Sequence, residues 1–214
     1  MIISTGRKYI FVHIPKTGGT SMALALEDRA MADDIMLGDT PKARRRRKRV
    51  QGAKTRGRLW KHSTLSDIEG LLPGDTLDGL FAFTLVRNPW DRAVSYYHWL
   101  KQQVFDHPAV TLAARLDFQG FITHDQTLTA FRQTPAASYM RRPDGREHCN
   151  AYIRIERFDE DSAPLVQHLG FGLTLPHDNR SPRDSDYRAY YSDRAAEAVA
   201  KACSEDIGRF GYSF

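Results

Sequence analysis

The chain has 214 residues, which is enough for one α/β domain with its own core and too few for two large independent domains. Hydrophobic residues make up 41% and charged residues 27% of the sequence, so a disordered or fibrous protein is excluded. The net charge of +5 favours an anionic partner, such as a nucleotide, an acidic glycan, a nucleic acid or a membrane surface, and indicates no fold. We expect a single domain over residues 1–214.

The cysteine content and hydropathy predict a cytoplasmic protein. Cys149 and Cys203 are too few for a disulfide framework and lack the spacing of a metal site. No run approaches the ~18 apolar residues that cross a bilayer, and Met1–Val12 resembles a first strand rather than a signal peptide. The sequence indicates no oligomeric state.

Two predicted strands are each followed by a predicted helix in the first half of the chain. The first strand is expected at Lys8–Ile14, and a turn containing two glycines leads from it into a helix at Thr20–Ala30. The second strand, Leu80–Val86, is almost continuously apolar, as expected for a strand buried on both faces. Asn88-Pro89 then suits a helix N-cap with proline in the first helical position.

A third strand–helix pair and a final helix are predicted in the second half. The strand is expected at Ala151–Arg157, followed by a helix that ends at Gly170, and an amphipathic helix is expected at Ser192–Ile207. Strands that alternate with helices favour a three-layer α/β/α fold with a mainly parallel central sheet.

The segment 33–59 differs from the rest in composition and is predicted to be an insert. Its Ala43–Arg58 part carries nine lysines and arginines and almost no apolar residues. It is either an exposed loop or a docking surface for an anionic acceptor, a phosphate backbone or a lipid membrane.

The turn after the first predicted strand has the composition of an anion site. A buried strand that ends in two glycines and a helix start directs backbone N–H groups and the positive end of the helix dipole at one point. A lysine and three hydroxyl residues add further donors. The residues expected to contact the anion are Lys16, Thr17, Gly18, Gly19, Thr20 and Ser21.

The turn differs from the known nucleotide motifs. In the nucleoside-triphosphate P-loop the lysine follows the glycines, whereas Lys16 precedes them. The second strand ends in Arg87, where a magnesium-binding aspartate would be expected in a P-loop enzyme. We therefore expect protein cations, and no metal ion, to neutralise the ligand. A metal-dependent nucleotide kinase stays open as an alternative.

A second candidate anion site follows the second strand. Arg87 stands at the end of a strand, where open α/β sheets bind ligands. Ser95, two helical turns into the next helix, is expected to share a phosphate with it.

These motifs together resemble the sulfotransferases that use 3′-phosphoadenosine-5′-phosphosulfate (PAPS), particularly the carbohydrate branch and its bacterial relatives. The stretch 15–21 is similar to that family's 5′-phosphosulfate loop, and the stretch 86–97 to its 3′-phosphate element. Residues 205–212 resemble its closing helix, and residues 154–158 a strand end of the family, with Ile155 and Phe158 as departures. The resemblance runs from about residue 8 to the end, apart from the insert.

The resemblance implies a P-loop-like sulfotransferase fold and in-line transfer of a sulfuryl group from PAPS, with PAP as the other product. Lys16 would stabilise the leaving phosphate, because charge grows there in the transition state. His62, in a Lys-His-x-Thr segment similar to the family's, would be the general base, and Lys61 would help to bind the acceptor.

Further contacts are less sharply indicated. The stretch 177–191 is either a surface loop or a cover over the nucleotide, with Arg180, Ser181 and Arg183 as contacts. Arg154 and Glu156 either orient the acceptor or stabilise the fold. The resemblance to the carbohydrate branch favours a carbohydrate or glycoconjugate hydroxyl as acceptor, and a small metabolite stays open as an alternative. A nucleic-acid-binding module that uses the basic insert is the alternative outside enzymes, but no obligatory nucleic acid is expected.

Overall fold

The computed structural model describes residues 1–176, 184 and 186–214. The chain forms two compact units, each built from two stretches of sequence. The sheet unit comprises Met1–Val86 and Ala136–Asp178, and the helical unit comprises Arg87–Pro135 and Asn179–Phe214. The boundary between Val86 and Arg87 therefore separates the second predicted strand from its helix.

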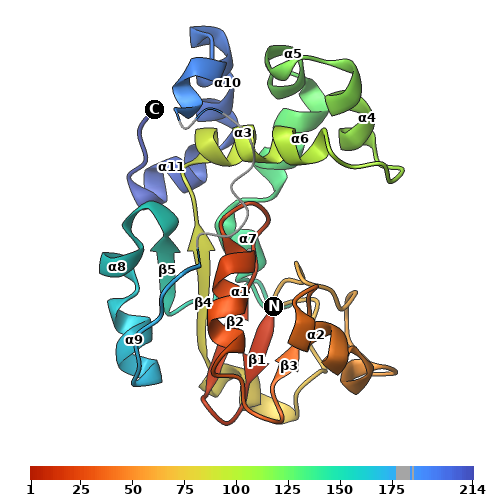
Figure 1. Cartoon of the computed structure of the whole chain (residues 1–214), viewed down its shortest axis with the longest axis vertical. Coiled ribbons are helices and arrows are strands. Elements are labelled where there is room, and N and C mark those ends of the chain that lie inside the picture. The colour runs from red at the N-terminus through yellow and green to blue at the C-terminus, as the bar shows by residue number, and fades with distance from the viewer. Residues whose placement is uncertain (177–183, 185) are drawn as a thin grey trace. The chain divides into compact units, whose positions relative to one another are not determined.

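A five-stranded mixed sheet forms the centre of the sheet unit, with strand order β3-β1-β2-β4-β5 (Figure 1). Strands β2, β4 and β5 run parallel, whereas β1 pairs antiparallel with β2 and β3. The strands are β1 (Ile2–Ser4), β2 (Tyr9–Val12), β3 (Ile35–Met36), β4 (Phe81–Val86) and β5 (Ala151–Arg154). The predicted parallel arrangement is confirmed for the strands that carry the motifs, and the antiparallel edge was not predicted.

Both faces of the sheet are buried, as the apolar strands predict. Alternate residues point to opposite faces: Phe11 and Phe83 pack in one cluster, and Ile10 and Ala82 in the other. Helices α1 and α9 cover the first face, and the irregular segment 59–80 with α7 covers the second. The helices of the unit are α1 (Gly19–Glu27), α2 (Pro41–Arg46), α7 (Ala136–Tyr139), α8 (Phe158–Asp161) and α9 (Ala163–Leu169), with 3₁₀ helices at Arg47–Val50, Gly74–Gly79 and Ile155–Arg157.

The helical unit packs around one aromatic-rich core. Its helix α3 begins as predicted, because the Asn88 side chain accepts hydrogen bonds from the backbone N–H groups of Trp90 and Asp91, and Pro89 is the first helical residue. The helices are α3 (Pro89–Leu100), α4 (Pro108–Arg115), α5 (Phe118–Ile122), α6 (Asp125–Gln133), α10 (Asp193–Ala202) and α11 (Ser204–Phe210), with a 3₁₀ helix at Tyr187–Tyr190.

Three predicted elements differ in the structure. The third strand ends at Arg154 and continues as a 3₁₀ helix. The predicted final helix is broken at Cys203, which separates α10 from α11. The stretch Ser66–Glu69 has the Ser-x-x-Glu pattern of a helix start but forms a series of turns. Thr64 and Asp67 nevertheless accept hydrogen bonds from each other's backbone N–H groups, as in a capping box.

The basic insert is folded, and the exposed-loop interpretation of its first half was wrong. Thr40 caps α2 by accepting from the Ala43 N–H, and Pro41 is its first residue. Three of its cations are anchored by backbone carbonyls: Lys42 donates to Glu27 O, Arg46 to Asp34 O and Arg49 to Ala32 O. The exposed cations of the insert are Arg44, Arg45, Arg47, Lys48, Arg49, Lys54, Arg56 and Arg58. None of the helices in the described part of the chain is both long and apolar enough to span a bilayer.

Candidate functional site

The loop between β2 and α1 has the backbone conformation of an anion site. Lys16 and Gly18 both adopt left-handed conformations, with φ angles of 66° and 85°. Lysine is unusual there, and such strain is typical of functional sites. Gly18 is the N-cap of α1 and provides no side-chain cap. The first N–H groups of α1 also have no partners within the helix. The positive end of the helix dipole therefore faces this loop and would favour an anion there.

The two glycines are also required by packing inside the sheet unit. A Cβ atom at Gly18 would lie 2.2 Å from Ile155 Cδ1, and a Cβ atom at Gly19 would lie 2.0 Å from the His13 ring. The imidazole ring is rigid, so its contact with Gly19 cannot be relieved by a small rotamer change. The glycine pair thus both shapes the loop and seats it against His13 and Ile155.

Replacing Gly19 with alanine is expected to destabilise the sheet unit by about 1–3 kcal/mol, the usual cost of overpacking. Gly208 is the matched control: it is also helical, and a Cβ atom there would contact nothing within 4 Å. Gly208→Ala should raise stability by up to ~1 kcal/mol, because alanine favours the helix. Urea unfolding of both variants checks this. Equal effects of the two substitutions would contradict the packing argument.

His62 lies beside this loop and is held in one tautomer. Its Nδ1 is 2.8 Å from the carbonyl oxygen of His13, and the two imidazole rings meet edge to face at 4.6 Å. A carbonyl oxygen can only accept, so Nδ1 carries the proton and Nε2 retains its lone pair. Trp60 packs against the other side of the His62 ring at 5.0 Å. The geometry therefore presents Nε2 as a proton acceptor.

Both histidines are neutral near pH 7. Burial lowers the pKa of His62 to about 4, although its hydrogen bond to the His13 carbonyl opposes this shift, and the nearby Lys61 adds to it. Burial also lowers the pKa of His13 well below its usual value, with the N-terminal ammonium and His62 adding to the shift.

Stability is therefore expected to depend on pH between 6.5 and 4. In this range the unfolded chain binds protons at His13 and His62 that the folded protein does not, so the free energy of unfolding falls as the pH falls. Each histidine contributes at most about 1.4 kcal/mol per pH unit. Chemical unfolding at several pH values should show a shallower pH dependence for His62→Ala. An unchanged dependence would mean that the pKa of His62 is the same in the folded and the unfolded protein.

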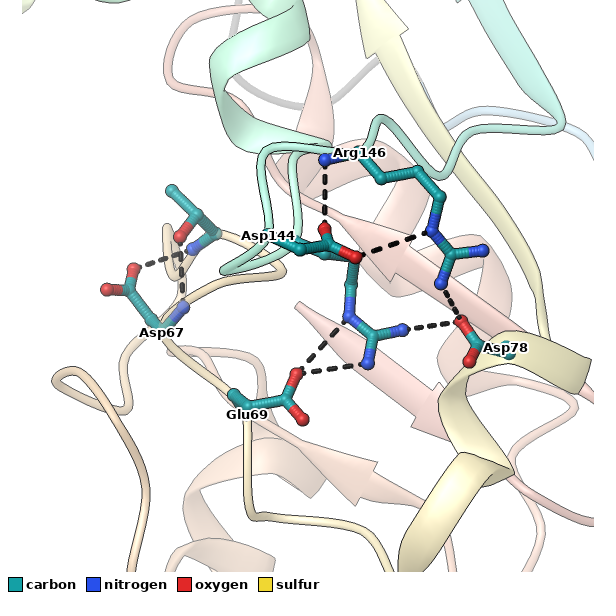
Figure 2. A network of polar contacts seen from close by, with 7 residues as sticks. Asp67, Glu69, Asp78, Asp144 and Arg146 are labelled. Atoms are coloured by element: carbon teal, nitrogen blue, oxygen red, sulfur yellow. Dashed lines mark hydrogen bonds and ion pairs between the residues drawn. The ribbon is translucent and has the colours of Figure 1, made fainter.

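The segment that carries His62 is fixed on both sides. Ser63 is fully buried, and its hydroxyl accepts from Trp60 N–H at 2.9 Å, which closes the turn. An ion-pair network follows, in which Arg142 bridges Glu69 at 3.0 Å and Asp78 at 2.7 Å. Figure 2 shows the labelled members Glu69, Asp78 and Arg146 of this network. The network ties the segment after His62 to the hairpin at 141–147, and Leu65 N–H bonds to Tyr139 O. His62 thus stands on a rigid base.

Lys61 points toward a carboxylate. Its Nζ lies 2.8 Å from Asp39, and this ammonium is the main reason that the pKa of Asp39 is lowered. The backbone carbonyl of Lys61 accepts from the N-terminal amine of Met1 at 2.9 Å. Asp39 belongs to the insert and was not singled out in the sequence.

In the helical unit, Arg87 lies two residues before the start of α3, and Ser95 lies within this helix. The Arg87 guanidinium pairs with Asp91, with Nη2 2.6 Å and Nε 2.8 Å from one carboxylate oxygen. Ser95 is buried one turn further along the helix. The i, i+4 spacing of Arg87, Asp91 and Ser95 is consistent with a shared face. Asp91 therefore orients the guanidinium.

The other predicted contacts fall into two groups. Arg154 forms a bidentate ion pair with Asp161, in which Nε donates at 2.7 Å and Nη2 at 2.9 Å. Because both residues belong to the sheet unit, the pair indicates a role in stabilising the fold. Glu156 is exposed in the 3₁₀ helix after β5. Arg180, Ser181 and Arg183 lie outside the described residues.

His13 falls inside the strand predicted at Lys8–Ile14, and its contacts with the candidate site are not indicated by the sequence. The structure places it just after β2, where its ring packs on Gly19 and its carbonyl fixes the His62 tautomer. No local pattern pairs these two histidines. Among the described residues, no group of three or more histidine, cysteine, aspartate or glutamate side chains could hold a metal ion.

The fold and this junction define an α/β protein with a strand–loop–helix turn of the anion-binding type. A sequence profile of the sulfotransferase family matches residues 1–213, so the chain belongs to the sulfotransferase family. The crystal structure of mouse sulfotransferase SULT7A1 complexed with PAP matches with a TM-score of 0.51 and 15% identity, and the match covers 94% of this chain and 84% of that one. No curated protein sequence matches the chain.

Proposed function

We propose that the protein transfers the sulfuryl group of PAPS to an acceptor hydroxyl. The observation that carries the proposal is the pairing of an uncapped α1 N-terminus, entered through the strained Lys16, with a neutral histidine whose Nε2 is the basic atom. His13 joins these two features, since its ring contacts Gly19 and its carbonyl bonds to His62. The family membership and the likeness to a PAP-bound sulfotransferase support the same reaction.

The donor would be held mainly by the loop and the start of α1. Lys16 and the hydroxyls of Thr20 and Ser21 would bind the 5′-phosphosulfate, together with the backbone N–H groups of Gly18 and Gly19. Thr17 has a different role, because its buried hydroxyl donates to Ile14 O at 2.9 Å and so shapes the loop. The helix terminus and Lys16 supply the positive charge that a metal ion supplies in P-loop kinases, so we propose that no metal is needed.

The 3′-phosphate would be bound by Arg87 and Ser95. Arg87 follows Val86 directly, and β4, which ends there, runs parallel to the strand that leads into the Lys16 loop. Ligands of open α/β sheets bind at this carboxyl edge of parallel strands. Contacts from Arg180, Ser181 and Arg183 remain predictions.

The reaction would proceed by in-line displacement. The acceptor oxygen forms a bond to sulfur while the bond from sulfur to the bridging phosphate oxygen breaks, and the acceptor proton passes to His62 Nε2. Lys16 would stabilise the charge that develops on the leaving phosphate. Bound next to these groups, the anionic donor would raise the pKa of His62 and so strengthen it as a base.

A carbohydrate or glycoconjugate acceptor and a cytoplasmic location stay predictions. Lys61 is better placed than Arg154 to contact an acceptor, because its ion pair with Asp39 is more exposed than the pair of Arg154 with Asp161. The contact of Glu156 with the acceptor stays a prediction.

Titration calorimetry with EDTA present tests the donor site. PAP is expected to bind without metal and ATP much more weakly, and Arg87→Ala should weaken PAP binding by about 10-fold or more. Magnesium-dependent ATP turnover would instead favour the kinase. Neutralising Arg44, Arg45, Arg47 and Lys48 should leave PAP binding intact, whereas salt-sensitive nucleic-acid binding that this change abolishes would favour the nucleic-acid module.

A further inference from the structure

A small cavity of about 220 Å³ lies inside the sheet unit beside the first half of α1. Its walls come from α1, from the chain after β3 and from α2. The apolar side chains on these walls are Ala23, Leu24, Met36, Leu37, Pro41 and Ala43. The volume is below the usual range for drug-sized ligands and suits one ring or a short alkyl chain.

The polar end of the cavity lies next to the proposed reaction centre. His13, Thr20 and Lys61 all line it. Thr20 belongs to the first turn of α1, and Lys61 immediately precedes His62. The His13 ring lies 4.6 Å from the His62 ring, and His62 itself does not line the cavity, so the acceptor's hydroxyl would extend past the His13 ring to reach the proposed base.

The charges that border the cavity compensate each other. Lys61 Nζ and the Asp39 carboxylate are 2.8 Å apart, and both side chains are substantially exposed. The pair therefore marks the solvent side. Met1 also lines the cavity, and its buried N-terminal amine already donates to the carbonyl oxygens of Leu37 and Lys61. A bare sugar in this space would lose hydrogen bonds to water that apolar walls cannot replace, at a cost of about 1–3 kcal/mol for each unsatisfied group.

We infer that this cavity binds the acceptor, and that the acceptor carries its hydroxyl on a compact apolar body such as a single aromatic ring or a short alkyl chain. The inference rests on the proposed sulfuryl transfer and narrows its substrate class. A glycoconjugate would be an acceptor of this class only if it carries an apolar group small enough for the cavity.

Gly38 offers a way to fill the cavity without disturbing the fold. It lines the cavity, its φ is not in the left-handed region, and a Cβ atom there would lie 3.9 Å from Ala43 Cβ and 4.0 Å from Lys61 Cβ, both ordinary contacts. Leucine at this position would occupy much of the space, and alanine a small part of it. Gly172 is the control, because a Cβ atom there contacts nothing within 4 Å.

Ligand-observed NMR of the full chain with PAP present tests the inference. Benzyl alcohol, 4-methylphenol and cyclohexanol serve as apolar probes, with methyl glucoside as the polar one. We expect at least one apolar probe to bind more tightly than methyl glucoside, with binding at least 10-fold weaker in Gly38→Leu, weaker by a smaller factor in Gly38→Ala and unchanged in Gly172→Leu. Binding of no apolar probe, tighter binding of methyl glucoside, or no effect of Gly38→Leu would overturn the inference.

Two further measurements separate this inference from the proposed function. Calorimetry with PAP is run on the same variants, and thermal unfolding confirms that each is folded. Wild-type protein that binds the apolar probes but not PAP would overturn the sulfotransferase proposal and leave an apolar site. Protein that binds PAP but none of the probes would overturn the acceptor assignment alone. Labelled sulfate transferred from PAPS to the best apolar probe would support both.

Discussion

Lys16→Ala is expected to weaken PAP binding by about 10- to 100-fold, because a charge-assisted hydrogen bond to phosphate contributes about 1.5–3 kcal/mol. Turnover with PAPS should fall further, by about 10²- to 10³-fold, since the charge on the leaving phosphate is greatest in the transition state. Calorimetry with PAP and single-turnover transfer of labelled sulfate measure the two effects separately.

Lys8 is the matched control for this variant. Among the residues that the structure describes, it is the other non-glycine residue with a left-handed backbone, with φ of 55°, and it belongs to the same unit. Alanine keeps the Cβ atom, so the backbone strain is unchanged in both variants and their stabilities should change little and alike. Only Lys16→Ala should lose PAP affinity. PAP binding that stays within about twofold of wild type would remove Lys16 from the donor site.

His62→Ala is expected to reduce turnover by about 10²- to 10⁴-fold and to leave PAP affinity within a few-fold of wild type. The reason is the hydrogen bond from Nδ1 to the His13 carbonyl, which leaves Nε2 as the basic atom. Added imidazole should restore part of the turnover, because it replaces the missing base. Calorimetry with PAP and steady-state rates with and without imidazole check the prediction.

His148 is the control histidine. Like His62, it bonds to a backbone carbonyl, but through Nε2, which lies 3.0 Å from the carbonyl oxygen of Leu80. His148 belongs to no predicted motif. His148→Ala should leave turnover unchanged apart from a loss of stability. Weaker PAP binding in His62→Ala without a specific loss of turnover would make His62 a donor-binding residue rather than the base.

The fold was predictable where the signals are local. Continuous apolar runs identified β2 and β4, and Asn88 and Pro89 gave the start of α3 to the residue. The β1–β2 hairpin was missed because its turn ends at Lys8, whose left-handed backbone is not indicated by a lysine in the sequence.

Helix α2 was missed for a different reason. A run of arginines has the composition of an exposed loop, yet arginine is a good helix former, and Thr40-Pro41 is an N-cap signal that could have been recognised. Both observations were in the sequence, and charge was given more weight than helix propensity.

Only part of the candidate site could be predicted. Lys16, Gly18 and Gly19 are neighbours in sequence, so their pattern is visible there. The contact between His13 and His62 joins residues 49 positions apart and follows from packing alone. The partners Asp91 of Arg87 and Asp161 of Arg154 are closer in sequence, and the first has the i, i+4 spacing that could have revealed it.

A crystal structure of the protein with PAP is the most direct test of the central claim, which is that the junction of β2 and α1 binds the donor's 5′-phosphate. The expected complex has this phosphate within hydrogen-bond distance of Lys16 Nζ and the N–H groups of Gly19 and Thr20, and the 3′-phosphate on Arg87 and Ser95. A nucleotide bound elsewhere, with this loop open to solvent, would contradict the account.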